Sequence, residues 1–156
     1  MKKESIKILL VDDEPDIIEI IRFNLEQKGY TIFTASDGIE AIRIAEEKLP
    51  HLIIMDVMMP NLDGIEACER LRADDRFKDT IIMFLTARSE DYSYVAAFDA
   101  GADDYVPKPI KPKVLMSKVK GLLRRFREKE DKQNILKFDQ LLIDLEAYKI
   151  INKGKE

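Results

Sequence analysis

The chain contains few of the residues that crosslinks and transition-metal sites require. Its 156 residues include one cysteine, Cys68, which excludes an internal disulfide and a cysteine-based zinc site. The single histidine, His51, excludes a site with several histidine ligands, and we expect it to be an ordinary surface residue. No apolar run approaches the ~20 residues that a membrane helix needs, and the first residues lack the apolar stretch of a signal peptide. We therefore expect a soluble, cytoplasmic protein without a membrane partner.

The charge is unevenly distributed along the chain. The 26 Lys and Arg residues and the 30 Asp and Glu residues give a formal net charge of -4. Residues 1–117 hold 15 basic and 23 acidic residues, whereas residues 118–156 hold 11 basic and 7 acidic residues. An acidic main body argues against nucleic acid binding by that body.

Short apolar runs alternate with longer segments of helical periodicity. Strands are predicted at 6–11, 30–34, 52–55, 80–85 and 104–106. Helices are predicted at 14–28, 37–48, 63–72, 89–100 and 111 to about 129. In the second helix, we expect Ile39, Ile42 and Ala45 to face the core. Five strand–helix repeats predict an α/β fold, with a doubly wound parallel sheet of five strands and helices on both of its faces.

Chemically useful side chains follow four of these strands. Asp12 and Asp13 follow the first strand, Asp56 the third, Thr86 the fourth, and Lys108 the fifth. Because ligands bind at the carboxyl ends of strands in such sheets, we expect these side chains to meet at one edge. Clustered carboxylates with oxygen ligands suit Mg²⁺, and an aspartate beside Mg²⁺ and an ammonium group is well placed to attack a phosphoryl group. Asp12, Asp13 or Asp37 taken alone is equally consistent with a helix cap.

Four segments of the chain resemble the receiver domain of two-component response regulators. They are LLVDDEPDI (9–17), LIIMDVMMPNLDGIEACERLR (52–72), IIMFLTAR (81–88) and AGADDYVPKP (100–109), in the family's order and at its spacing. The resemblance implies the strand order 2-1-3-4-5.

The resemblance also implies roles for the residues at the edge. Asp56 is the expected phosphoacceptor. Asp13 is expected to ligate Mg²⁺ directly and Asp12 mainly through water, while the backbone carbonyl of Met58 completes the protein ligands. Lys108 is expected to pair with the phosphoryl oxygens.

Two further residues resemble the family's switch pair. The Thr86 hydroxyl is expected to move onto the phosphoryl group, and Tyr105 to turn inward behind it. The Lys108–Pro109 peptide bond is expected to be cis. Because the Met58 side chain offers nothing to orient an attacking water, we expect a long-lived phosphoryl group.

Several charged residues resemble those through which the winged-helix (OmpR/PhoB-like) transcription factors dimerise. Dimerisation in that subfamily uses the fourth helix, the fifth strand and the last helix. The candidate residues here are Asp103, Asp104, Lys118, Arg124 and Arg125. Val114 stands where that subfamily usually has an acidic residue, and the alternative for this surface is an ordinary solvated helix face.

The end of the chain predicts a short β-rich tail. Residues 1–125 form the expected receiver domain, and the polar residues 126–134 are expected to be a helix end and linker. Short strands are predicted within residues 135–156, which resemble the opening sheet of a winged-helix DNA-binding domain cut short. DNA contacts would then need the missing part of that domain. The alternative is a naturally short regulator whose tail packs on the receiver or between protomers.

The leading hypothesis is a phosphorylation-activated switch that a sensor histidine kinase phosphorylates and that controls transcription. It predicts a signalling protein that supports only its own phosphoryl transfer and hydrolysis. A stand-alone receiver, acting in a phosphorelay or as a protein-binding module, is the second hypothesis. A small Mg²⁺-dependent phosphatase is the third, although Asp56 lacks the second aspartate that such enzymes carry nearby.

Overall fold

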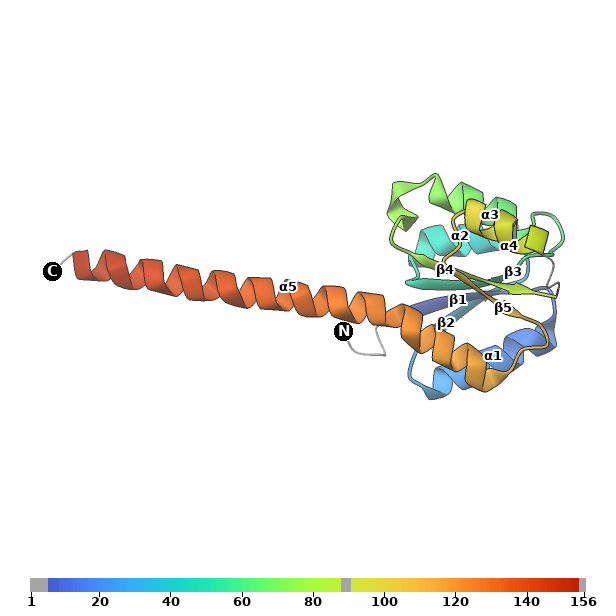
Figure 1. Ribbon diagram of the computed structural model, residues 1–156, viewed down its shortest axis with the longest axis horizontal. Helices are drawn as coiled ribbons and strands as arrows, with labels where there is room; N and C mark the ends of the chain where they lie inside the picture. Colours follow the sequence, from blue (N-terminus) through green and yellow to red (C-terminus); the bar gives the residue numbers. More distant parts are fainter. Residues whose placement is uncertain (1–5, 88–90, 155–156) are drawn as a thin grey trace. The chain divides into compact units, whose positions relative to one another are not determined.

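The computed structural model describes residues 6–87 and 91–154 and contains one parallel sheet with helices on both faces (Figure 1). The strands are β1 (Lys7–Val11), β2 (Thr31–Ala35), β3 (Leu52–Asp56), β4 (Ile81–Thr86) and β5 (Asp104–Pro107). The helices are α1 (Pro15–Gln27), α2 (Gly38–Lys48), α3 (Gly64–Arg72), α4 (Asp91–Asp99) and α5 (Pro112–Gly154). The strand order is β2-β1-β3-β4-β5, which confirms the predicted doubly wound sheet.

The chain divides into two compact units, Met1–Leu122 and Leu123–Glu156. In the first unit, α1 and the opening turns of α5 cover one face of the sheet, and α2, α3 and α4 cover the other (Figure 1). The central strands β3 and β4 are buried at every position because both of their faces are covered.

Local sequence explains where the helices on the α2 side begin. The Asp37 side chain accepts a hydrogen bond from the Glu40 amide at 2.8 Å, and this contact caps α2. Asp63 caps α3 in the same way, through the Glu66 amide at 2.8 Å. One prediction for α2 is wrong, because Ile39 is 58% exposed while Ala45 is fully buried. The buried face of α2 consists of Gly38, Ala41 and Ala45, and Ile39 lies one position beyond that face.

The predicted β-rich tail is wrong. The last helix does not end near Lys129 but continues as α5 to Gly154, through the residues predicted as linker and as strands. Short apolar runs fit either a strand or a helix by periodicity alone. No glycine or proline lies between Gly121 and Gly154, and within the described part of the tail the Gln140 amide bonds Asp144 one turn away at 3.0 Å.

No helix in the described part of the chain is both long enough and apolar enough to cross a membrane.

Candidate functional site

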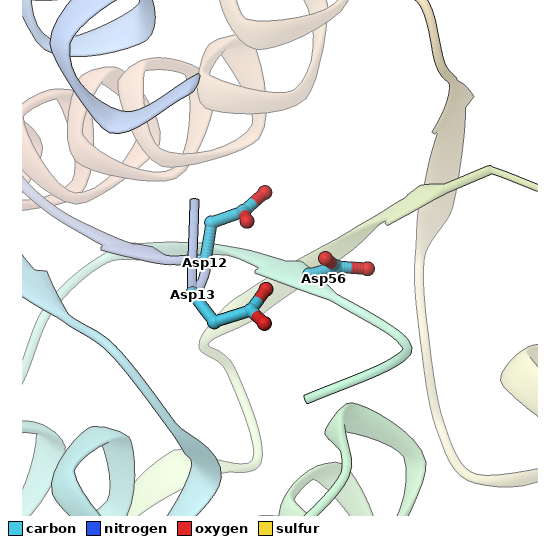
Figure 2. Close-up of side chains that lie close together, drawn as sticks. All are labelled: Asp12, Asp13 and Asp56. Atoms are coloured by element: carbon cyan, nitrogen blue, oxygen red, sulfur yellow. The ribbon is translucent and has the colours of Figure 1, made fainter. Parts of the chain in front are cut away.

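Three carboxylates meet at the carboxyl edge of the sheet. Figure 2 shows Asp12 and Asp13 at the end of β1 and Asp56 at the end of β3, with their side chains gathered together. One oxygen from each carboxylate lies within 4.8 Å of the others. Strands β1 and β3 are neighbours in the sheet, and Val11 pairs with Met55, so the ends of the two strands lie side by side. Asp12 and Asp56 are 2% and 5% exposed, whereas Asp13 is exposed.

Lys108 places one ammonium group between the two buried carboxylates. Its Nζ donates a hydrogen bond to Asp56 Oδ2 at 3.0 Å and lies 3.1 Å from Asp12 Oδ2. Glu14 Oε1, on an exposed side chain, is 3.6 Å from the same nitrogen. The lysine follows β5 and precedes a cis peptide bond to Pro109, as predicted. Residues from three strands thus form one charge cluster.

The cluster is short of positive charge. Burial raises the pKa of the Asp12 carboxyl, and the Asp56 charge adds to this, while the Glu14 amide and Lys108 oppose it. Burial alone would lower the pKa of Lys108, but the hydrogen bond to Asp56 and the charges of Asp56 and Asp12 outweigh it, so that pKa is raised. Lys108 is therefore charged at neutral pH and offsets only one of three carboxylates.

The donor set fits a divalent cation that prefers oxygen ligands. Asp12 Oδ2 is buried and accepts no hydrogen bond from the described residues, because its ion pair with Lys108 lacks hydrogen-bond geometry. A buried carboxylate oxygen without a hydrogen bond, beside two further carboxylates, suits Mg²⁺, which prefers an octahedral shell of oxygen ligands.

Backbone groups hold the end of β3 in place. Asp56 Oδ1 accepts a hydrogen bond from the Met58 amide at 3.1 Å, and the Gly64 amide donates to the Val57 carbonyl at 2.9 Å. A Cβ at Gly64 would overlap the Asp56 carbonyl oxygen, so glycine is needed for this approach. The Met58 side chain is 65% exposed, which leaves the entrance to the site without a polar side chain at this position.

The two predicted switch residues lie on neighbouring strands. Thr86 ends β4 and is 4% exposed. Tyr105 is on β5 opposite Phe84, and its ring packs edge-to-face on Phe98 of α4 with centroids 6.0 Å apart. Lys118 Nζ lies 5.3 Å from the centre of the same ring. Tyr105 therefore has contacts with both α4 and the start of α5.

The residues predicted for a dimer surface have partners within the chain or lie in the second unit. Asp104 pairs with Lys118 at 3.2 Å. Asp103 Oδ2 accepts hydrogen bonds from the Ile82 amide at 2.9 Å and from Arg72 at 3.0 Å. Arg124 and Arg125 belong to the second unit and are exposed.

Arg72 is a structural residue that the sequence analysis did not select. Its guanidinium donates to the carbonyls of Gly101, Phe77 and Thr80 as well as to Asp103. It therefore joins the end of α3 to the turns before β4 and β5. The signal available in the sequence was an arginine in the last turn of a helix, which is common and has no specific meaning.

Cys68 and His51 have structural roles in the described part of the chain. Burial raises the pKa of the Cys68 thiol to about 11, and its Sγ donates to the Ala100 carbonyl at 3.3 Å. The His51 ring is half-buried, and its Nδ1 accepts a hydrogen bond from the Lys7 amide at 3.0 Å. Neither residue lies among the groups that could hold a metal ion.

Curated relatives are transcriptional regulators of the OmpR/PhoB family. The chain is 47% identical over 119 residues to the alkaline phosphatase synthesis transcriptional regulatory protein PhoP of Bacillus subtilis. The aligned residues cover 76% of this chain and 49% of PhoP. It is 41% identical over 156 residues to the transcriptional regulatory protein ResD of the same organism, covering 96% of this chain and 64% of ResD. The chain thus spans about half to two thirds of the length of these relatives.

Solved structures show the same fold. The chemotaxis response regulator CheY4 of Vibrio cholerae is 31% identical, with a TM-score of 0.73 over 76% of this chain and 98% of CheY4. A two-component response regulator from Clostridium difficile is 32% identical, with a TM-score of 0.74 over 78% of this chain and 98% of the other. Residues 8–120 match the family described as the response regulator receiver domain. The chain therefore belongs to the response regulator receiver family, whose members are signalling modules rather than enzymes.

Proposed function

We propose that this chain is a phosphorylation-activated switch in which Asp56 accepts a phosphoryl group from a sensor histidine kinase in the cytoplasm. The observation that carries the proposal is the position of the Lys108 ammonium between the buried carboxylates of Asp12 and Asp56. An acidic triad of this kind is typical of the Mg²⁺ site of a receiver.

The proposed reaction is transfer of a phosphoryl group from a phosphohistidine to a carboxylate. An Asp56 oxygen attacks phosphorus, the P–O bond forms as the P–N bond breaks, and the imidazole of the kinase leaves with the electron pair. Lys108 already donates to Asp56 and is placed to pair with an oxygen of the transferred group. Hydrolysis of the aspartyl phosphate would release inorganic phosphate and restore the carboxylate.

Asp12, Asp13 and Asp56, with the backbone carbonyl of Met58, are the residues that would hold Mg²⁺. The ion supplies positive charge against the oxygens of the transferring group. Asp12 Oδ2 supports this assignment, because it is buried and its ion pair with Lys108 leaves it without a hydrogen bond from the described residues. Asp13 is exposed.

We propose that Thr86 and Tyr105 transmit the change. Thr86 stands at the end of a strand adjacent to β3, from which its hydroxyl can reach a group on Asp56. A shift of Thr86 would leave space toward β5, into which the Tyr105 ring could turn. Because Tyr105 packs on Phe98 and Lys118, such a turn would alter the surface of α4, β5 and α5.

That surface is the proposed site of homodimerisation on phosphorylation. Three apolar side chains on α4 and the start of α5 are exposed there: Val95, Phe98 and Val114. The Asp104–Lys118 pair at 3.2 Å could be exchanged for pairs with a second copy. Asp103, Arg124 and Arg125 complete the proposed charged set, in which individual exposed pairs contribute little.

We further propose that the switch controls transcription through an effector domain and that the receiver comprises residues 1–125. The similarity to PhoP and ResD, which are both named as transcriptional regulatory proteins, supports this reading. DNA contact would be made by the effector domain. A stand-alone receiver acting in a phosphorelay or as a protein-binding module is the second candidate, and the self-contained first unit is compatible with it.

The test is incubation with Mg²⁺ and acetyl phosphate, followed by intact mass spectrometry and size-exclusion chromatography. Wild type should gain one phosphoryl group and shift toward dimer, whereas Asp56→Asn should do neither. An adduct of equal yield in both proteins would exclude Asp56 as the acceptor. An Asp56-dependent adduct without a shift would retain the acceptor and exclude dimerisation by this chain alone.

A further inference from the structure

The loop between β3 and α3 is attached to the start of α2. The Asn61 side-chain amide donates a hydrogen bond to Asp37 Oδ2 at 2.9 Å, and the Gly38 amide donates to the Leu62 carbonyl at 3.2 Å. We call Asp37, Gly38, Asn61 and Leu62 the α2 clasp. All four lie outside the acidic triad and outside the proposed switch pair.

The residue types of the clasp match an unusual local geometry. Asn61 has a φ of +66°, in the left-handed region that asparagine adopts more readily than most residues. A Cβ at Gly38 would overlap the Leu62 carbonyl oxygen, so the close approach of α2 to the loop requires glycine. The Leu62 side chain is 5% exposed and anchors the loop in the core.

Asp37 serves the clasp and the helix at once. Its Oδ1 caps α2 through the Glu40 amide, while Oδ2 accepts the hydrogen bond from Asn61. These two bonds lower the pKa of the Asp37 carboxyl, so at neutral pH it is ionised and able to accept both. Both carboxylate oxygens of Asp37 are therefore engaged, one by the helix and one by the clasp.

The clasp restrains the loop at its end away from Asp56. At the near end, the Met58 amide donates to Asp56 Oδ1 at 3.1 Å. Between these two attachments lies the Met58 carbonyl, which is the proposed backbone ligand of Mg²⁺. A backbone carbonyl has no side-chain torsion that could reorient it, so its direction depends on how the two ends of the loop are held.

We propose that the α2 clasp positions the Met58 carbonyl for Mg²⁺, with Asn61 as a positioning residue that does not touch the ion. The inference rests on the proposed function, because it takes that carbonyl as a ligand. It predicts that loosening the clasp weakens Mg²⁺ binding even where all three carboxylates are unchanged.

Two uncharged substitutions loosen the clasp by different means. Asn61→Gly removes the donor while retaining a residue that accepts positive φ. Gly38→Ala adds a Cβ that must displace the Leu62 carbonyl. In titration calorimetry of the whole chain with MgCl₂, each should raise the Mg²⁺ dissociation constant about threefold to tenfold, the effect of one lost hydrogen bond or a comparable displacement.

The matched control is Asp74→Ala. Asp74 also caps a short helical turn, through the Arg76 amide at 3.0 Å, but this turn follows the far end of α3. In Asp74→Ala, the urea unfolding midpoint should shift while the Mg²⁺ dissociation constant does not. The clasp variants should behave in the same way if the clasp only stabilises the fold. An unchanged dissociation constant in Asn61→Gly, with wild type binding Mg²⁺, would overturn the inference and leave the proposed function intact. Absence of Mg²⁺ binding by wild type would instead overturn the proposed function.

Discussion

Replacing Lys108 with methionine removes the positive charge from between two buried carboxylates and keeps an aliphatic chain of similar length. Asp12 and Asp56 are 2% and 5% exposed, and the Lys108 side chain is 13% exposed, so solvent can do little to replace the ammonium. Lys108→Met should therefore destabilise the protein in the absence of Mg²⁺.

The expected cost follows from the two ion pairs. At 3.0 Å and 3.1 Å, each attraction is about 5 kcal/mol at an effective dielectric constant of 20. Two effects reduce this cost. The substitution also removes the desolvation penalty of the buried ammonium group, and Asp12 can take up a proton because its pKa is already raised. We expect a net loss of about 2–3 kcal/mol in the free energy of unfolding, somewhat below the usual cost of breaking a fully buried pair.

The assay is urea unfolding at pH 7.5, in EDTA and again in MgCl₂. The raised pKa of Lys108 means that its stabilisation is complete below 10.5, the ordinary value, and is lost only as the pH rises through the higher folded value. At pH 7.5 wild type should show the full effect. Mg²⁺ should restore more stability to Lys108→Met than to wild type, because the ion replaces the missing charge.

Lys118→Met is the matched control. Lys118 pairs with Asp104 at 3.2 Å, but the two side chains are 33% and 27% exposed, so its loss should cost about 1 kcal/mol or less. Equal losses in the two variants, with the same response to Mg²⁺, would refute the reasoning that Lys108 balances a buried charge cluster.

Three further predictions concern other parts of the first unit. Arg72→Met should lower the free energy of unfolding by about 3 kcal/mol, because it removes the cation that faces Asp103 and the donor to the Phe77, Thr80 and Gly101 carbonyls; the exposed Arg76, changed in the same way, should have little effect in the same urea titration. Burial, with help from the charge of Lys7, lowers the pKa of His51, so the folded state resists protonation and wild type should lose stability as the pH falls below 6.5. His51→Asn, which keeps an acceptor for the Lys7 amide, should lose that slope between pH 7.5 and 5.5, and equal slopes would contradict the assignment. Met58→Asn should shorten the lifetime of the phosphoryl group roughly threefold to tenfold by giving the attacking water a polar neighbour, as followed by intact mass after removal of the phosphodonor.

The sequence was most informative where one physical constraint acts on many residues at once. Each strand needs an apolar run because both faces of the sheet are covered, and β3 and β4 were found within one residue of their bounds. The meeting of Asp12, Asp13 and Asp56 followed from parallel strands alone, since their carboxyl ends share an edge.

Contacts between distant segments were not readable in this way. Nothing local distinguishes Arg72, which bonds Asp103 31 residues further along, or Asn61, which bonds Asp37 24 residues earlier. Ile39 fitted a helical period with Ile42, but the face that α2 buries is the one set by Gly38, Ala41 and Ala45, and the choice between these faces depends on the contact of Gly38 with the distant Leu62. The prediction for the tail was wrong for a different reason: apolar runs such as residues 141–145 satisfy both the strand and the helix pattern.

The central claim is that Asp56 carries the phosphoryl group, and chemical trapping tests it most directly. Borohydride reduces an acyl phosphate on aspartate to homoserine, so treatment after incubation with Mg²⁺ and acetyl phosphate marks the acceptor for peptide mass spectrometry. Homoserine at position 56, and unmodified Asp12 and Asp13, is the predicted result. Homoserine at position 12 or 13 with Asp56 unmodified, or no homoserine in a protein that has gained a phosphoryl group, would contradict the account.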